Sequence, residues 1–188
     1  MNLVAPFFFV SFFPLPPSYC FLSLSQLSLS LSLSLSQRQP EARVVFTFLR
    51  HAESVFNETG YSGYDAPITR RGAVRASELT GDYDYVMVST MLRARETFAR
   101  SAITSPSVEF STLCRERMIE TPCNMMSGET GVAETEEDFL FRMQMLRSFL
   151  KRKSATCQRI RICCHHKVMR ELVGVDAENC ESVTLARL

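Results

Sequence analysis

The sequence has almost no net charge, and it is short for a protein of more than one domain. Lysine and arginine together number 21 and aspartate and glutamate 20, so the formal net charge is +1. A chain without an excess of positive charge is not expected to be a general binder of nucleic acid or of anionic membranes. Its 188 residues suffice for one domain with a real core and are too few for two comfortable ones.

The cysteines lack the spacing of a metal or redox centre. Seven are present, an odd number, and none forms a C-x-x-C pair. Cys163 and Cys164 are adjacent, so in a strand they point to opposite faces and cannot easily bridge each other. We therefore expect small, buried, reduced cysteines, which favours a reducing compartment and a cytoplasmic location.

Charge is absent from the start of the chain, where no charged side chain occurs before Arg38. Residues 6–21 are rich in Phe and Pro, and Leu and Ser alternate from Leu27 to Ser36. A secretory signal usually begins with basic residues, a mitochondrial transit peptide is rich in arginine, and a membrane helix needs about 20 mostly apolar residues. The segment fits none of these patterns well.

A repeat in the coding sequence would explain the alternation, because CTC encodes Leu and TCT encodes Ser. We hypothesise that residues 1–42 are a low-complexity segment outside the fold, arising from translated upstream sequence. The alternative is a genuine targeting segment, and residues 1–36 are the only part we consider for membrane association. Residues 43–188 are expected to form the domain.

From Arg43 onward, short apolar runs alternate with helical patterns. Val44–Leu49 is a continuous apolar run typical of a central parallel strand. Further strands are expected at 85–89, 108–110, 159–164 and 182–188, and helices at 69–79, 92–103, from 135 onward and at 167–173. Residues 114–131 are expected to be irregular. This alternation predicts an α/β fold of three layers, a mostly parallel central sheet flanked by helices.

The chain has only three histidines, and all follow predicted strands. His51 follows Arg50 at the end of the first strand, and His165 and His166 follow strand 159–164. In a layered α/β domain, groups just beyond the carboxyl ends of parallel strands line the ligand crevice. Two such ends with imidazoles, one beside an arginine, indicate a site for an anionic substrate.

Five segments after residue 43 occur in the order of one family's motifs. They are Arg50-His51-Ala52-Glu53-Ser54 with Asn57, Asp65-Ala66-Pro67-Ile68-Thr69 with Gly72, Ser89-Thr90-Met91-Leu92-Arg93-Ala94 with Thr97, Cys114-Arg115-Glu116, and Cys164-His165-His166. They resemble the R-H-G-E-[TS]-x-x-N, D-x-P-L-T-x-x-G, S-P-L-x-R-A-x-x-T, L-x-E and S-H-G segments of the histidine phosphatase (phosphoglycerate mutase-like) superfamily, in its small-phosphatase branch.

The resemblance implies a phosphomonoester hydrolase that acts through a phosphohistidine. His51 would be the nucleophile, His165 a donor to the phosphoryl group and Glu116 the proton donor to the leaving alcohol. Arg50, Arg93 and Asn57 would bind the phosphate, for which an arginine fork is suited. The same arginines would lower the pKa of His51 and keep it neutral.

No metal or other cofactor is expected, because the arginines supply the positive charge that a phosphate needs. Cys163, Cys164 and the two histidines after them lack zinc spacing. The expected partner is a small phosphorylated substrate or a phosphoprotein. The sequence leaves the oligomeric state open, and specificity would lie in the loops at 54–67 and 114–131.

Departures from the family pattern leave some assignments open. Cys114 stands for leucine, so Glu120 and Glu129 compete with Glu116 as the acid. Ala52 and His166 stand for glycines and Thr90 for proline, and we interpret His166 as a packing or capping group and Arg95 as a surface charge. The alternative functions are phosphoglycerate mutase-type phosphotransfer and a catalytically silent member that binds phosphate or a phosphoprotein.

Overall fold

The computed structural model describes residues 43–60, 63–119, 122–125 and 132–188. The predicted low-complexity segment at 1–42 lies outside the described residues, as do Glu120 and Glu129, the two alternative acids. No helix within the described ranges is long and apolar enough to cross a membrane.

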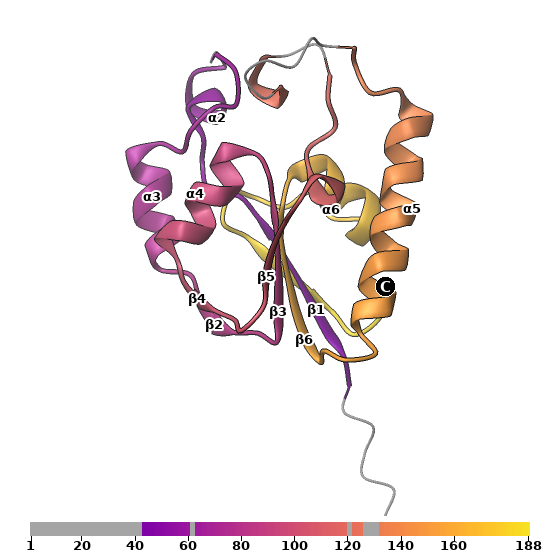
Figure 1. The fold of residues 1–188 in the computed structure, drawn as a ribbon. Helices are drawn as coiled ribbons and strands as arrows, with labels where there is room; N and C mark the ends of the chain where they lie inside the picture. Colours follow the sequence, from indigo (N-terminus) through magenta and orange to yellow (C-terminus); the bar gives the residue numbers. More distant parts are fainter. Residues whose placement is uncertain (1–42, 61–62, 120–121, 126–131) are drawn as a thin grey trace, which may run out of the picture. The chain divides into compact units, whose positions relative to one another are not determined.

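A five-stranded sheet forms the middle layer (Figure 1). Its strand order is β5 (Val108–Ser111), β3 (Tyr85–Ser89), β6 (Arg159–Cys164), β1 (Val45–Arg50) and β7 (Ser182–Leu185). β5, β3, β6 and β1 pair in parallel, while β7 runs antiparallel to β1. The predicted mostly parallel central sheet is therefore confirmed.

Helices cover both faces of the sheet, as Figure 1 shows. On one side lie α3 (Arg70–Ser77) and α4 (Leu92–Arg100), and on the other lie α5 (Glu136–Lys153) and α6 (His166–Val173). Each face has its own apolar cluster, and alternate residues of β6 divide between them. Cys163 and Cys164 thus face opposite layers, as expected, and the six cysteines of the described ranges are free thiols.

Several element boundaries differ from the predicted ones. The helix expected at 92–103 ends at Arg100, because Ser101 is extended and β4 (Ala102–Thr104) pairs with β2 (Thr80–Asp82) as a separate two-stranded sheet. A short helix, α2 (Val55–Thr59), lies within the expected loop at 54–67. Of two short 3-10 helices, η1 (Thr112–Cys114) ends where the expected irregular segment 114–131 begins, and η2 (Pro122–Asn124) lies inside that segment. The sequence did not indicate these short helices and three-residue strands, because each has too few side chains to show a hydrophobic period.

Strand register brings the chemical groups together at one edge. Arg50 pairs with Cys164 at the carboxyl ends of β1 and β6, so the residues that follow, His51 and His165, emerge side by side. The His51 amide donates to the Cys164 carbonyl at 3.1 Å, which continues the strand pairing into the site.

Gly72 in the first turn of α3 is pressed against the chain that follows β1. A Cβ at this position would stand 2.3 Å from the carbonyl oxygen of Glu53. The Thr69 amide donates to that same oxygen at 2.8 Å, and the Thr69 hydroxyl, which caps α3, donates to the Glu53 carboxylate. Glycine is therefore required for the close approach of α3 to the segment after His51.

Replacing Gly72 by alanine should lower the free energy of unfolding of the full chain by about 1–3 kcal/mol, because the added methyl meets backbone that cannot easily move. Urea denaturation measures this. Gly63→Ala is the matched control, since a Cβ there meets nothing within 4 Å, and its effect should stay within about 0.5 kcal/mol. Equal stability of the two variants would contradict this role of Gly72.

Candidate active site

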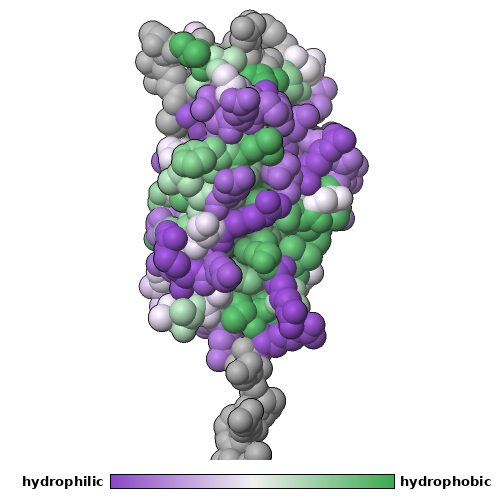
Figure 2. Space-filling view, turned by 90° about the vertical axis from the view of Figure 1, so that its right-hand side faces the viewer, coloured by the Kyte–Doolittle hydropathy of each residue, from purple (hydrophilic) through white to green (hydrophobic). Residues whose placement is uncertain are grey.

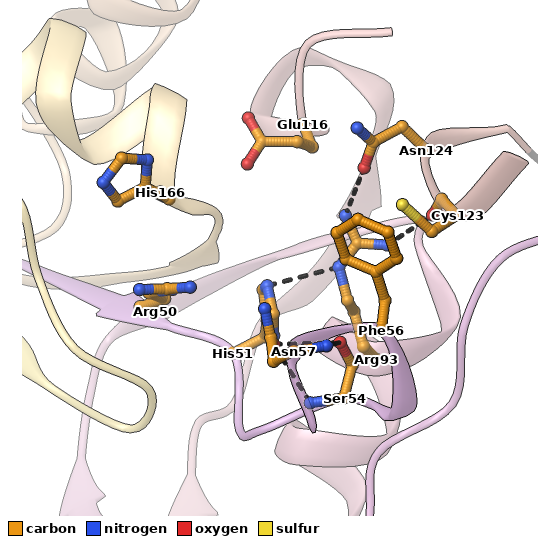
Figure 3. A pocket seen from close by; sticks show the side chains of 10 residues that line it. All are labelled: Arg50, His51, Ser54, Phe56, Asn57, Arg93, Glu116, Cys123, Asn124 and His166. Carbon is orange, nitrogen blue, oxygen red and sulfur yellow. Dashed lines mark hydrogen bonds between the residues drawn. The ribbon is translucent and has the colours of Figure 1, made fainter. Parts of the chain in front are cut away.

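A cavity of about 100 Å³ lies at the carboxyl edge of the parallel strands (Figure 3). It is lined by Arg50, His51, Ser54, Phe56, Asn57, Arg93, Glu116, Cys123, Asn124 and His166. Five of the six predicted site residues are in this set. The sixth, His165, is fully buried beside it, with its ring centroid 5.1 Å from that of His51.

The hydrogen bonds of His51 define its protonation state. Its Nδ1 lies 2.7 Å from the Ala52 carbonyl oxygen, which can only accept, so the ring proton is on Nδ1. Nε2 keeps its lone pair and accepts from Nε of Arg93 at 3.2 Å, as Figure 3 shows. Burial, followed by the charges of Arg93 and Arg50, holds the pKa of His51 well below its usual value. The imidazole is therefore neutral, with its free nitrogen on the cavity side.

Arg93 is held in place through the helix that carries it. The N-terminus of α4 is capped by Asp65, whose Oδ1 accepts from the Leu92 amide at 2.8 Å. The Thr97 hydroxyl donates to the Arg93 carbonyl at 2.6 Å and accepts from the Ala52 amide at 2.8 Å. This bond explains the four-residue spacing of Arg93 and Thr97, because one hydroxyl joins α4 to the residue after His51.

The guanidinium of Arg93 also contacts the η2 segment on the far side of the cavity. Its two terminal nitrogens donate to the Cys123 carbonyl at 2.8 Å and to Oδ1 of Asn124 at 3.0 Å (Figure 3). Arg93 is 4% exposed. It thus links the nucleophile candidate to residues that follow about 30 positions later in the chain.

Arg50 and Asn57 are oriented by the loop that precedes β7. Arg50 donates to the Ala177 carbonyl at 2.7 Å, and Asn179 donates from Nδ2 to the His51 carbonyl at 2.9 Å and to Asn57 Oδ1 at 3.3 Å. The backbone and hydroxyl of Ser54 also donate to Asn57 Oδ1, which completes a capping box on α2. With its oxygen so engaged, Asn57 has its NH₂ group available to a ligand.

His165 has one nitrogen paired and one unpaired within the described residues. Its Nε2 lies 2.7 Å from the Ser89 hydroxyl oxygen, which accepts from the Met91 amide at 3.3 Å. The serine oxygen can accept a second hydrogen bond or donate its own proton, so this contact fits either ring tautomer of His165. Nδ1 is buried without a hydrogen-bond partner in the described structure. A buried polar atom without a protein partner is a candidate contact for a ligand.

Glu116 faces His51 from the other side of the cavity in Figure 3. It is 9% exposed, and its two carboxylate oxygens accept from the amides of Arg117 at 3.0 Å and Lys167 at 3.4 Å. Lys167 lies in the first turn of α6, so the carboxylate stands at a helix N-terminus. Cys114 is fully buried in the core, as a leucine would be, which supports the register that we assumed for Glu116.

The structure adds lining residues that the sequence did not indicate. His166 was expected to be a packing or capping group, but its ring lines the cavity while Nε2 contacts Asp176 Oδ1 at 3.0 Å. Ser54 and Phe56 lie inside the first matched motif and could have been considered. Cys123 and Asn124 come from the irregular segment, where no period or motif marks them. Within the described ranges, no group of three or more His, Cys, Asp or Glu residues could hold a metal ion.

Solved structures resemble this fold, whereas no family model and no curated protein matches the sequence. The alpha-ribazole phosphatase from Shigella flexneri is 17% identical and has a TM-score of 0.59, with 75% of this chain and 89% of that chain covered. Phosphoglycerate mutase from Thermus thermophilus is 18% identical, with a TM-score of 0.56 and coverage of 76% and 92%. Phosphoserine phosphatase from Entamoeba histolytica is 18% identical, with a TM-score of 0.56 and coverage of 75% and 89%.

These similarities establish the fold of the described residues. The chain has the α/β fold of phosphoglycerate mutase-like proteins, which is the fold that its motifs implied. Because the identities are below 25%, the similarity shows architecture, and the chemistry has to be argued from the side chains of this chain.

Two buried neutral histidines make the folded state sensitive to acid. Burial, with nearby positive charge, holds the pKa values of His51 and His165 well below their usual range, whereas in the unfolded chain they titrate near a pH of about 6.5. Below that pH the unfolded state binds more protons than the folded state. Stability should therefore fall as the pH falls.

Between about pH 6.5 and about pH 5, the free energy of unfolding should fall by up to roughly 1.4 kcal/mol per pH unit for each of these two histidines. His165→Gln should remove one of the two contributions and flatten the slope. Arg95→Ala, an exposed change on α4, is the control and should leave the slope unchanged. Denaturant unfolding across this range measures it, and equal slopes in the two variants would refute the assignment.

Proposed function

We propose that this protein is a metal-independent phosphomonoesterase that acts through a phosphorylated His51. The observation that carries the proposal is the state of His51, a buried neutral imidazole whose unprotonated Nε2 faces a cavity between Arg50 and Arg93. A phosphate dianion needs cations around its oxygens and a nucleophile in line with the leaving oxygen.

In the first step, Nε2 of His51 attacks phosphorus and the bond to the leaving oxygen breaks. Glu116, on the opposite wall, gives its proton to that oxygen, and the alcohol departs. In the second step, water attacks the phosphohistidine, Glu116 takes the water proton, and phosphate leaves with His51 restored. In the proposed tautomer His165 carries its proton on Nδ1 and donates to a phosphoryl oxygen in both steps, which gives this unpaired buried nitrogen a partner.

Substrate binding requires Arg93 to exchange partners. Its Nε now donates to Nε2 of His51, and that bond has to open before Nε2 can reach phosphorus. Its terminal nitrogens now donate to neutral oxygens of Cys123 and Asn124. Phosphate oxygens accept stronger, charge-assisted hydrogen bonds. Arg50 and the NH₂ group of Asn57 complete the proposed phosphate contacts.

Hydrolysis is favoured over mutase-type transfer. The similar structures include two phosphatases and one phosphoglycerate mutase. A cavity of about 100 Å³ suits a phosphoryl group with a small leaving group. The proposed substrate is therefore a small phosphorylated compound or an exposed phosphorylated side chain.

The free thiols favour a cytoplasmic location for the protein.

The full chain should hydrolyse p-nitrophenyl phosphate in the presence of a metal chelator, and His51→Ala should lower kcat about a thousand-fold or more. Label from a ³²P-substrate should remain on the wild-type protein after denaturation in alkali, where phosphohistidine persists, and should be absent from His51→Ala. Arg95→Ala, an exposed change on the same helix as Arg93, should keep full activity. Phosphate binding without turnover would instead support the catalytically silent alternative.

The role of Glu116 should appear as a dependence on the leaving group. Glu116→Gln should slow hydrolysis of an alkyl phosphate about 100-fold or more, because a poor leaving group needs the proton. Hydrolysis of p-nitrophenyl phosphate, whose leaving group departs as an anion, should fall less than about 10-fold. His166→Gln is the matched comparison on the same cavity. If its losses show this pattern and those of Glu116→Gln do not, the acid has been assigned to the wrong residue.

A further inference from the structure

The outward side of α5 is apolar at positions where a solvent-facing helix is normally polar. Its inward residues Phe139, Met143, Leu146 and Leu150 belong to the core. On the other side, Phe141 is 64% exposed and Met145 46% exposed. Figure 2 looks onto this side of the molecule, where hydrophobic surface appears between hydrophilic residues. The core therefore leaves these two large side chains uncovered.

The exposed apolar residues belong to a stripe along one face of the helix. Glu137, Phe141, Met145, Ser148 and Arg152 follow one another at spacings of four, four, three and four residues, which places them in line on an α-helix. A surface hollow of about 260 Å³ follows most of this line and is lined by Phe141, Gln144, Met145, Ser148 and Arg152. We call these residues, with Glu137, the α5 stripe.

The α5 stripe is self-complementary under a two-fold rotation that makes two copies of the helix antiparallel. The midpoint of Glu136–Lys153 falls between Gln144 and Met145. A two-fold axis through that midpoint pairs Glu137 with Arg152 of a second copy, and Phe141 with Ser148. The first turn is acidic, with Glu136, Glu137 and Asp138, and the last turn is basic, with Lys151, Arg152 and Lys153.

We propose that the α5 stripe is the contact of a homodimer in which the α5 helices of two copies pack antiparallel. Each end would bring opposite charges together, while Phe141 and Met145 of both copies cover one another in the middle. One self-complementary patch repeated about a two-fold axis is the commonest way in which soluble chains associate.

The charges alone would not carry this proposal, because an acidic start and a basic end also stabilise an isolated helix through its dipole. Their combination with a central hollow that contains two exposed large apolar side chains, Phe141 and Met145, is what fits a second copy. A helix of 18 residues is about 27 Å long. A single helix pair lies at the small end of stable interfaces, so we expect a dissociation constant on the order of 10 µM.

Sedimentation of the full chain over a concentration series tests the proposal. The mass should rise from that of the 21.4 kDa monomer to twice that value. Phe141→Arg should raise the dissociation constant at least about 30-fold, because it replaces the most exposed apolar side chain of the contact by a charge that would be buried against the second copy. Phe110→Arg, at a side chain that is also exposed, on β5, should change nothing. Unchanged circular dichroism and phosphatase turnover would show that the variants are folded.

Paired charge reversals identify the antiparallel register. Glu137→Lys and Arg152→Glu should each weaken the dimer about 10-fold, and the double variant should restore it. Arg100→Glu, at the last residue of α4, is the control for a reversed charge at a helix C-terminus. A wild-type chain that stays monomeric, an association that persists in Phe141→Arg, or a double variant no stronger than the single ones would overturn the proposal.

Discussion

The hydrogen bond from Nδ1 of His51 to the Ala52 carbonyl is the constraint on which the proposed chemistry depends. It fixes the ring proton on the nitrogen that faces the backbone and leaves the lone pair on Nε2, the atom that would act as the proposed nucleophile. Burial and two flanking guanidinium groups then prevent Nε2 from being protonated. Without the bond the ring proton would no longer be fixed on Nδ1, and without the burial Nε2 would be protonated at a higher pH.

The rest of the fold keeps that carbonyl in position. The Ala52 amide is held by the Thr97 hydroxyl, and the next residue, Glu53, is held by Thr69 and by the close approach of Gly72. Holding this two-residue segment in place thus requires both α3 and α4. Thr69, Gly72 and Thr97 belong to two motifs that are separate along the sequence, and in the fold all three contact the segment after His51.

Sequence reasoning was most successful where a residue's surroundings are local. Apolar runs located β1, β3 and β6, and the strand-end histidines located the site, because parallel strands place their carboxyl ends at one edge. It missed β2 and β4, which are stabilised by pairing with each other and have no apolar run. It also could not place Asn124 or His166 on the cavity, since their positions depend on contacts with Arg93 and Asp176 that only the folded chain creates.

The contacts of Arg93 would connect the proposed substrate binding to the η2 segment, which lines the cavity. The Arg93 guanidinium donates hydrogen bonds to His51, Cys123 and Asn124, so this cation is surrounded by neutral acceptors. A dianion that displaces the Cys123 carbonyl and the Asn124 amide gains charge-assisted bonds and releases the η2 segment from Arg93. In the proposed mechanism, Cys123 and Asn124 would therefore compete with the phosphate for one guanidinium. Selectivity among phosphorylated compounds would then depend on whether the leaving group can replace the contacts that this segment loses.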